Sequence, residues 1–376
     1  MNNIKFLDLG AQQKKIKNFL DDNFKNVLKK SNYIMGSEVG ELEKKLQHYT
    51  NSQYCVTCSS GTDALILALL SLKIGKDDFV VCPSFTFPAT AEAILITGAK
   101  PIFVDVSKTT FNLCYKNLEN VLQKYKSKNK NIRAVIAVDL FGLPANYNRL
   151  KKIAKDYKVK IVSDAAQSFG ASFFEKKVGA INDITCTSFF PAKPLGCYGD
   201  GGALFVKTKF IRDKVISLRA HGKSKDKYTI VDVGLNSRLD TLQAAVLLAK
   251  LKIFSWELKE KEKIARLYTK ELEEYCDVPY VPKKTKSAWA QYTIQTNKRK
   301  KVLEYLKNKN IPTAIYYPIP MHLQPAYKKY HNKSFKMTNS LKLSKSVFSI
   351  PIHPYLEEVQ KEYIIESIKG AIKYAR

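Results

Sequence analysis

Short apolar segments alternate with stretches of helical periodicity through the first two thirds of this chain. The apolar segments have the length and residue types of buried strands, whereas the stretches between several of them repeat apolar residues at helical spacing. Seven strands are expected, over residues 54–58, 79–83, 101–106, 134–140, 160–163, 184–189 and 203–206. The helical stretches include residues 62–72, 89–97 and 147–157. This alternation predicts an α/β fold with a mainly parallel seven-stranded sheet that is covered on both faces.

The pattern changes after about residue 250. A long charged helix is expected there, followed by mixed segments with turns near Pro318, Pro320 and Pro325. We therefore expect a large domain over residues 1–250 and a smaller C-terminal α+β domain over residues 251–376. In a parallel sheet, ligands collect at the carboxyl ends of the strands, so the functional site is expected at that edge.

The net charge of the chain is +29, from 63 lysines and arginines against 34 aspartates and glutamates. Such a charge would suit a protein that binds nucleic acid. The lysines, however, form many separate groups on predicted helix faces and loops, for example at 124–130, 223–227, 283–286 and 298–301. A solvated lysine surface, with some attraction for an anionic substrate, is therefore favoured, and nucleic-acid binding is kept as an alternative.

Two features concern the cellular compartment. The first ten residues lack a basic region followed by an apolar one, and the longest apolar stretch, around residues 64–72, is too short to cross a bilayer. The seven cysteines are odd in number and scattered, which is typical of free thiols in a reducing compartment. Cys55 and Cys58 lie three apart on a predicted strand and should point to opposite faces, which disfavours a metal site. We expect a cytoplasmic protein without membrane insertion or a bound metal.

The common nucleotide-binding motifs do not match. A Gly-x-Gly-x-x-Gly sequence after a strand is missing from the chain. Residues 222–224, Gly-Lys-Ser, resemble the end of a P-loop, but Ser217 occupies the position of the first glycine that this motif requires. Hydrolysis of ATP is therefore disfavoured.

Three polar clusters lie at predicted strand ends. In the first, Ser-Ser-Gly-Thr-Asp-Ala at 59–64, a strand ends and a helix begins, so free N–H groups and hydroxyls could hold a phosphate or simply cap the helix. In the second, at 163–168, Asp164 follows a buried strand and needs a cationic partner. A protonated pyridine nitrogen would serve, as would a salt bridge; a helix cap is the other possible role. In the third, at 187–202, Lys193 lies among aromatic and small residues, where a partly dry pocket would make its amine a nucleophile able to form a Schiff base.

Together these clusters resemble the DegT/DnrJ/StrS-type family of nucleotide-sugar aminotransferases, which are fold-type I enzymes that depend on pyridoxal 5′-phosphate. The resemblance runs nearly from end to end. It begins with Phe-Leu-Asp-Leu at 6–9 and with Gln12, and continues through Gly-Ser-Glu-Val at 36–39 to Tyr-Pro-Ile-Pro at 317–320. Its most specific segment is Ser-Phe-Phe-Pro-Ala-Lys-Pro-Leu-Gly-Cys-Tyr-Gly-Asp-Gly-Gly at 188–202. The chain looks most similar to the enzymes that act on UDP-2-acetamido-2-deoxy-3-oxo-glucuronate.

The resemblance implies a set of residues that bind the cofactor. Lys193 would hold pyridoxal phosphate through a Schiff base, and Asp164 would pair with the pyridine nitrogen. The ring hydroxyl would contact Gln167, and Phe87 would stack on the ring. The cofactor phosphate would be bound by Gly61, Thr62 and Ser188, together with Asn236 of a second subunit. A homodimer with a shared active site follows from the last assignment.

The resemblance also implies the reaction. An amino group would pass from L-glutamate to a nucleotide-linked 3-keto sugar, for surface polysaccharide, lipopolysaccharide or O-antigen synthesis. The sugar pocket of the glucuronate-specific enzymes corresponds to Tyr33, Arg238, Tyr316 and Tyr317. Here Tyr316 stands where those enzymes have a histidine, and Ala192 stands where they have a serine. The sugar could therefore be the 3-oxo-glucuronate, the corresponding non-carboxylated 3-oxo-N-acetylglucosamine or, alternatively, a dTDP-linked keto-6-deoxyhexose.

Two other classes of function are compatible with this fold. Related dehydratases carry histidine in place of the cofactor-binding lysine, and Lys193 argues against that activity. A non-catalytic, basic nucleic-acid-binding protein is the second alternative.

Overall fold

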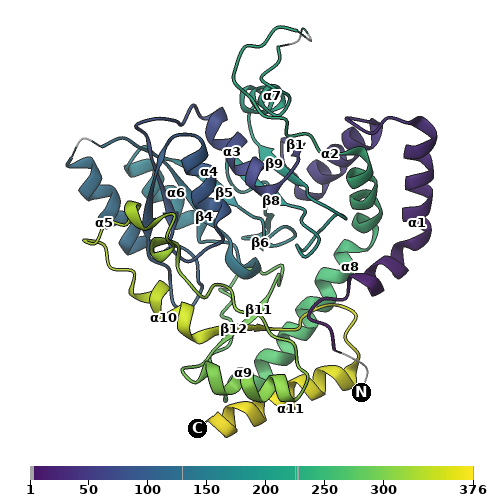
Figure 1. Cartoon of the computed structure of the whole chain (residues 1–376), viewed down its shortest axis with the longest axis vertical. Helices are drawn as coiled ribbons and strands as arrows, with labels where there is room; N and C mark the ends of the chain where they lie inside the picture. Colours follow the sequence, from purple (N-terminus) through teal and green to yellow (C-terminus); the bar gives the residue numbers. More distant parts are fainter. Residues whose placement is uncertain (1–3, 129, 225, 227, 376) are drawn as a thin grey trace.

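The computed structural model describes residues 4–128, 130–224, 226 and 228–375. A large sheet with its helices forms the upper part of the molecule in Figure 1, and a small sheet with its helices forms the lower part. The long helix α8 (Thr241–Leu272) runs between the two.

The large sheet has seven strands in the order β1-β9-β8-β5-β4-β2-β3. Its strands are β1 (Tyr54–Cys58), β2 (Phe79–Pro83), β3 (Lys100–Val104), β4 (Ile132–Val138), β5 (Lys160–Asp164), β8 (Ile184–Ser188) and β9 (Gly202–Val206). Only β9 runs antiparallel to its neighbours, β1 and β8. The predicted mainly parallel, seven-stranded sheet is confirmed, because all seven expected strands are present.

Alternate residues of β9 face two different groups of helices. Ala203 and Phe205 pack with residues of α1 (Leu9–Lys30), α2 (Ser37–Thr50) and α8. Leu204 and Val206 pack on the opposite side, in the main hydrophobic core of the sheet. That core includes residues of α3 (Gly61–Ser71), α4 (Ala89–Ile96), α5 (Tyr115–Lys126), α6 (Tyr147–Asp156) and α7 (Lys209–Leu218). Both faces of the sheet are therefore covered, as the two-residue period of a strand requires.

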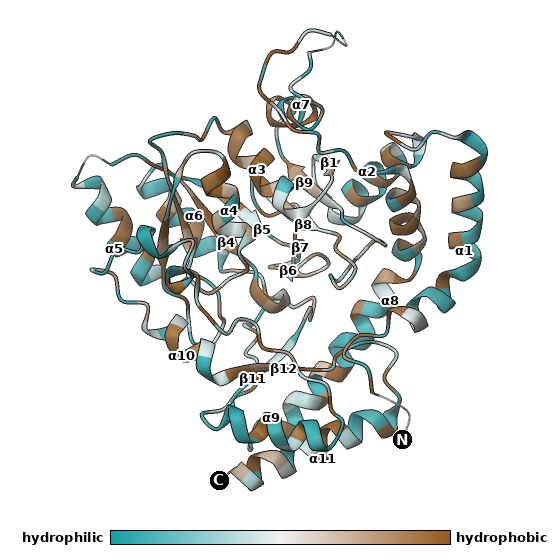
Figure 2. Ribbon diagram, in the orientation of Figure 1, coloured by the Kyte–Doolittle hydropathy of each residue, from teal (hydrophilic) through white to brown (hydrophobic). Residues whose placement is uncertain are grey.

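Helix α3 is the most deeply buried of the helices around the sheet. Residues 64–69 are all buried, and Figure 2 shows α3 as almost wholly hydrophobic, whereas α1 is mixed. A helix that is apolar on all sides belongs in the interior of a protein. Its N-terminus is thereby fixed against the sheet, next to the end of β8.

Helix α8 begins at Thr241, earlier than the expected charged helix after residue 250. Its first turns were missed because residues 244–249 are apolar and buried, without the charges that mark the rest. Its last turns, from Ile264 to Leu272, belong to a second hydrophobic core. The predicted domain boundary at residue 250 falls inside this helix, which contributes both to the second core and to the core that α1 and α2 form with the large sheet.

The second core has the α+β character expected of the C-terminal part. It contains the antiparallel strands β11 (Tyr292–Gln295) and β12 (Val347–Ile350) and the helices α9 (Arg299–Asn308) and α11 (Glu358–Ala375). The remaining elements are short: η1 (Leu140–Gly142), β6 (Ser172–Phe173), β7 (Lys176–Lys177), β10 (Thr285–Lys286), η2 (Met321–Leu323), η3 (Lys328–Tyr330) and α10 (Thr338–Ser346).

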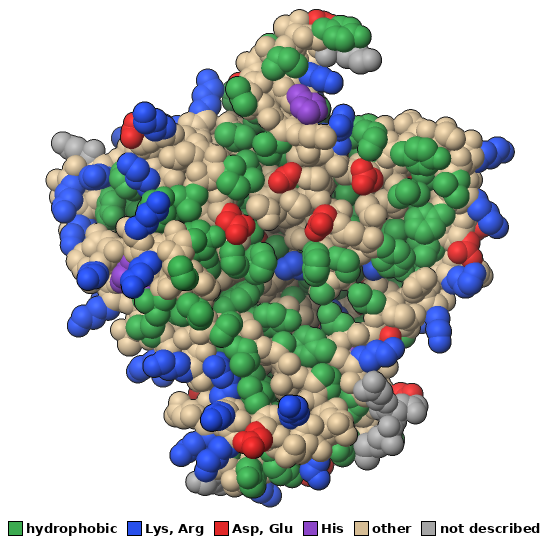
Figure 3. All heavy atoms as spheres, in the orientation of Figure 1, with side chains coloured by type: hydrophobic (Ala, Val, Ile, Leu, Met, Phe, Trp, Pro, Cys, Tyr) green, Lys and Arg blue, Asp and Glu red, His purple; other side chains and the backbone are tan. Residues whose placement is uncertain are grey.

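The surface and the cysteines bear on two expectations from the sequence. Lysines and arginines are scattered over the face shown in Figure 3; Lys225 and Lys227 of the predicted groups lie outside the described residues. Cys55 and Cys58 are free thiols that pack in different cores on opposite faces of the sheet, as predicted. Among the helices described, none is long and apolar enough to cross a membrane.

Candidate active site

The carboxyl ends of three parallel strands bring the predicted clusters to one edge of the sheet. Strand β1 ends at Cys58, directly before the first cluster, β5 ends at Asp164, and β8 ends at Ser188. The chain then turns from β8 into β9 through a loop, residues 189–201, that carries Lys193. We call this segment the lysine loop.

Asp164 and Lys193 lie close enough to influence each other's ionisation. Asp164 is 7% exposed, and its carboxylate accepts hydrogen bonds from Thr90 Oγ1 at 3.2 Å and from the Ala166 N–H at 3.1 Å. Burial raises the pKa of this carboxyl, and the Lys193 amine opposes that shift. Burial lowers the pKa of Lys193, which favours the neutral, nucleophilic amine that Schiff-base formation requires.

The start of α3 forms a cradle against the end of β8. The Ser60 hydroxyl caps the helix by accepting the Asp63 N–H at 3.0 Å. A Cβ atom at Gly61 would lie only 2.6 Å from the Cβ of Ser188, so glycine is required for this close approach. The first N–H groups of a helix lack intrahelical partners. The N–H groups of Gly61 and Thr62, with the Ser188 hydroxyl beside them, therefore fit an anionic phosphate.

Aromatic rings surround the space above Asp164. Gln167 accepts the Phe141 N–H at 2.7 Å through Oε1 and donates to Tyr317 Oη at 3.1 Å through Nε2. The second Nε2 proton of Gln167 is available for a ring hydroxyl. The ring of Phe87 lies 6.2 Å from that of Tyr317 and is 54% exposed, so one face is open for stacking. Carboxylate, amine, phosphate cradle and open aromatic face together fit pyridoxal phosphate.

Tyr316 and Tyr317 reach this edge from the C-terminal part of the chain. The Met321 N–H donates to the Ser84 carbonyl at 2.7 Å, and Ser84 Oγ lies 2.5 Å from His322 Nδ1. Burial lowers the pKa of His322 to about 4, so this histidine is neutral at pH 7. These bonds attach the Tyr316–Tyr317 segment to the loop after β2.

Tyr33, Asn236 and Arg238 form a second, separate group. The Tyr33 carbonyl accepts the Thr241 N–H at 2.9 Å, and Arg238 Nη2 donates to Asn236 Oδ1 at 2.5 Å. The Tyr33 and Asn236 side chains are exposed. Within the part of the chain that the structure describes, no hydrogen bond or ion pair joins these three residues to Lys193 or Asp164.

Three polar residues of the site were missed from the sequence. Thr90 donates to Asp164, and Ser237 Oγ lies 3.2 Å from Ser59 Oγ beside the cradle. Their sequence context is not distinctive. Asp139 accepts hydrogen bonds from Tyr147 and Ser168, and burial raises its pKa to about 7. Asp139 directly follows β4, and Asp164 is the last residue of β5. The position of Asp139 at a strand end could therefore have identified it from the sequence.

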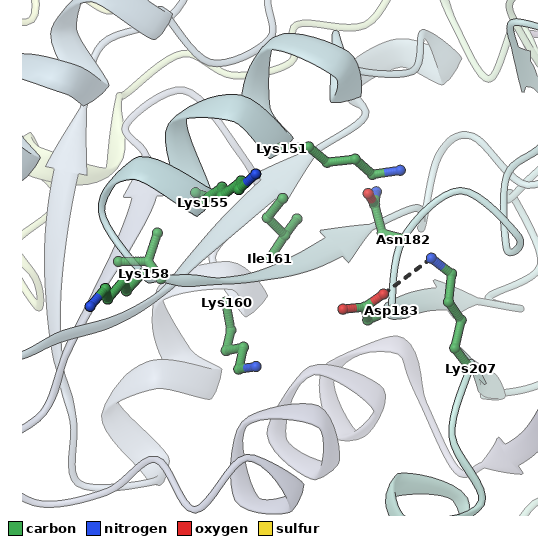
Figure 4. A pocket seen from close by; sticks show the side chains of 10 residues that line it. Lys151, Lys155, Lys158, Lys160, Ile161, Asn182, Asp183 and Lys207 are labelled. Atoms are coloured by element: carbon green, nitrogen blue, oxygen red, sulfur yellow. Dashed lines mark hydrogen bonds and ion pairs between the residues drawn. The ribbon is translucent and has the colours of Figure 1, made fainter.

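A lysine-lined cavity of about 480 Å³ opens at the opposite edge of the sheet. Figure 4 shows Lys151 near Asn182, and Lys207 paired with Asp183 at 3.1 Å. Lys160 begins β5 and Asp164 ends it, so this cavity is separate from the catalytic edge.

Comparison with known proteins decides the family. The profile of the DegT/DnrJ/EryC1/StrS aminotransferase family matches residues 14–369. The chain belongs to this family. That membership confirms the expected fold and shows that the chain is a pyridoxal-phosphate-dependent aminotransferase.

Two relatives and two structures illustrate the similarity. The chain is 39% identical over 366 residues to UDP-2-acetamido-2-deoxy-3-oxo-D-glucuronate aminotransferase of Pseudomonas aeruginosa, covering 97% of this chain and 99% of the relative. It is 34% identical to UDP-N-acetyl-3-dehydro-alpha-D-glucosamine 3-aminotransferase of Acidithiobacillus ferrooxidans, covering 98% of each. A DegT DnrJ EryC1 StrS aminotransferase from Brucella abortus superposes with a TM-score of 0.95 at 42% identity, covering 98% and 99% of the two chains. NtdA of Bacillus subtilis, solved with bound PMP, superposes with a TM-score of 0.91 at 27% identity. The match covers 99% of this chain and 86% of NtdA.

Proposed function

We propose that this aminotransferase moves an amino group from L-glutamate to a UDP-linked 3-keto sugar, with pyridoxal phosphate bound to Lys193. The observation that carries the proposal is that the half-buried Lys193 and the buried Asp164 lie together at the carboxyl edge of the sheet, where each affects the pKa of the other. The two relatives described above are named for UDP-linked 3-keto sugars, and a transaminase of a dTDP-linked sugar is less similar, at 32% identity. The dTDP-sugar and nucleic-acid alternatives are therefore not favoured.

The residues of the site have distinct chemical tasks. When bound, pyridoxal phosphate supplies the electron sink for amino-group transfer. The carboxylate of Asp164, oriented by Thr90 and Ala166, holds a proton on the ring nitrogen. Gly61, Thr62 and Ser188 bind the phosphate, while Gln167 and Phe87 orient the ring. The Lys193 amine would take the proton from the substrate carbon that carries the amino group and would deliver it to the cofactor carbon bonded to the same nitrogen.

Arg238 is the residue suited to a carboxylate on the sugar. A guanidinium can pair with a carboxylate through two parallel hydrogen bonds. Arg238 is half-buried, and its Nη2 donates to Asn236 Oδ1 at 2.5 Å. A guanidinium at this position supports UDP-2-acetamido-2-deoxy-3-oxo-glucuronate as the substrate. Because Tyr316 replaces a histidine of the glucuronate-specific enzymes, the non-carboxylated 3-oxo-N-acetylglucosamine is the alternative.

A second copy of the chain would complete the site. Exposed apolar side chains flank the separate group of Tyr33, Asn236 and Arg238: Ile34, Met35, Val231 and Val233 are 46%, 41%, 58% and 92% exposed. The segment before Asn236 extends away from the body at the top of Figure 1. Contiguous exposed apolar surface is typical of a protein–protein interface. In a symmetric dimer, Asn236 of each subunit would reach the phosphate in the other, with Arg238 and Tyr33 beside the sugar.

An assay with the two candidate sugars tests the substrate. Purified enzyme is incubated with L-glutamate and either UDP-2-acetamido-2-deoxy-3-oxo-glucuronate or UDP-3-oxo-N-acetylglucosamine. We expect 2-oxoglutarate and an equal amount of amino sugar, with the higher kcat/KM for the carboxylated substrate. Absence of 2-oxoglutarate with both sugars would overturn the proposed reaction. If both products form, the proposed role is in the cytoplasm, in the synthesis of a surface polysaccharide such as lipopolysaccharide or O-antigen.

A further inference from the structure

Helix α8 presents a row of polar side chains to the back of the lysine loop. Gln243, Lys250 and Glu257 are spaced seven residues apart, which is close to two helical turns, so they lie on one face of α8. Gln243 Oε1 accepts the N–H of Tyr198, which is part of the loop, at 2.9 Å. This end of the row therefore fixes the backbone just after Lys193.

Lys250 is an unusual member of this row because its side chain is completely buried. Its exposed fraction is 0%, and its Nζ has no hydrogen-bond partner in the described part of the chain. The ammonium lies 4.6 Å from the centre of the Tyr198 ring, within range of a cation–π interaction. Burial lowers the pKa of Lys250 to about 8.

Packing alone does not account for a lysine at this position. A buried cation without a hydrogen-bond partner costs free energy, and an apolar side chain of similar length would fill the same space at lower cost. Two interactions distinguish lysine from such a side chain here: its contact with the Tyr198 ring and its attraction to the Glu257 carboxylate one row position away.

The other end of the row reaches the segment of Lys193 itself. Glu257 and Lys261 line a cavity of about 30 Å³ together with Ala192, Lys193 and Gln12. Glu257 Oε1 accepts hydrogen bonds from Gln12 Nε2 at 2.8 Å and from the Tyr355 hydroxyl at 2.7 Å. Helix α8 therefore borders the lysine loop at two places: through a hydrogen bond at Tyr198, and across a small shared cavity at Ala192 and Lys193.

We propose that Lys250 is a positioning residue for the transamination, which holds the Tyr198 ring and thereby fixes the direction in which Lys193 leaves the loop. The proposal rests on the proposed role of Lys193. A loop that shifts by about 1 Å at a reacting amine can cost on the order of 100-fold in rate.

The first test is Lys250→Met in the holoenzyme. We expect kcat to fall roughly 10- to 100-fold with little change in the KM for L-glutamate, because substrate contacts are unaltered. The thermal midpoint should stay the same or rise, since an unpaired buried charge is removed. The apoenzyme should also gain visible absorption more slowly when pyridoxal phosphate is added, because that rate depends on attack by Lys193. A kcat equal to the wild type, or a midpoint that falls in step with the loss of kcat, would overturn the proposal.

Variants of Tyr198 keep the test decisive even if Lys250→Met fails to fold. Tyr198→Phe retains the ring and should retain kcat, whereas Tyr198→Leu should lose as much as Lys250→Met. The double variant that combines Lys250→Met with Tyr198→Leu should lose no more than either single variant, because both changes remove one interaction. Equal loss in the Phe and Leu variants would contradict the proposal.

Lys252→Met is the matched control. Lys252 is an exposed lysine on the same helix, and its Nζ lies 4.2 Å from the centre of the Phe19 ring. Its substitution should leave kcat and the rate of cofactor capture unchanged; an equal loss there would overturn the specific role of Lys250. If Lys193→Ala still binds the cofactor covalently, the proposed function fails. If Lys193 behaves as expected and only the Lys250 variants are unaffected, the positioning role alone fails.

Discussion

Burial shifts the pKa values of the neighbouring groups Lys193 and Asp164 in opposite directions. It lowers the pKa of the Lys193 amine and raises that of the Asp164 carboxyl, and each group opposes the shift of the other. No ion pair within 4.0 Å joins them in the described residues. A cationic ring nitrogen would therefore give Asp164 the partner that the chain does not provide, while leaving the Lys193 amine free to react.

Replacement of Asp164 separates cofactor binding from catalysis. Asp164→Asn should lower kcat by roughly 100-fold or more, because the neutral amide does not hold a proton on the ring nitrogen. The visible absorption of the bound cofactor should persist, because Lys193 is intact. Steady-state kinetics and absorption spectra check this, with the exposed Asp183→Asn as control. An Asp164→Asn enzyme within about threefold of the wild type would contradict the assignment.

Gly61 provides a test of the phosphate cradle. Gly61→Ala would place a Cβ atom 2.6 Å from that of Ser188, so α3 must move away from β8. We expect the Kd for pyridoxal phosphate, measured by titration of the apoenzyme, to rise at least about tenfold, a loss of about 1.4 kcal/mol. Gly40→Ala on α2 is the control, because nothing lies within 4 Å of the added atom. Equal affinity for pyridoxal phosphate in both variants would exclude a role of the start of α3 in binding the cofactor phosphate.

The lowered pKa of His322 predicts how the stability of the protein depends on pH. Its pKa is lowered by burial from 6.5 to about 4, so on acidification the unfolded chain takes up the proton before the folded protein does. The stabilisation is therefore present above pH 6.5 and is lost as the pH falls toward 4. His322→Gln should reduce the fall in unfolding free energy across this window by on the order of 1–3 kcal/mol. Urea unfolding at pH 7 and pH 5 measures this fall in each protein. The same fall in the wild type and in His322→Gln would count against this interpretation.

Complementation between inactive variants tests the shared active site. Asn236→Asp should inactivate the enzyme by placing a carboxylate beside the cofactor phosphate, and Lys193→Ala removes the amine. When the two variants are unfolded, mixed in equal amounts and refolded, half of the dimers contain one of each. Each mixed dimer has one intact site, so about a quarter of wild-type activity should return. No recovery, with dimers shown by sedimentation, would place Asn236 in the site of its own subunit.

Local sequence patterns predicted the sheet because most of its strands are short segments rich in apolar residues that end at, or just before, a polar residue. They failed at the start of α8, where the apolar residues 244–249 carry no charges to mark an exposed helix face. Boundaries shifted by one or two residues elsewhere, for example at β4, because side-chain patterns do not show where backbone pairing ends.

Site residues that lie close to a strand end could be identified from the sequence, whereas those brought together only by tertiary packing were missed. Asp164 and Lys193 stand next to strand ends and are visible in the sequence. Thr90 is 74 positions from Asp164, and His322 is 238 positions from Ser84, so only tertiary packing brings them together. The proposed role of Arg238 involves a second subunit, which local sequence patterns do not describe.

The visible absorption of the purified protein, before and after addition of L-glutamate, tests the central claim most directly. We predict an absorption band from pyridoxal phosphate bound covalently to Lys193, which L-glutamate converts to that of the pyridoxamine form as 2-oxoglutarate is released. Lys193→Ala should lack the covalent band. A wild-type protein that stays colourless after addition of pyridoxal phosphate, or a Lys193→Ala variant with the same spectrum as the wild type, would contradict the account.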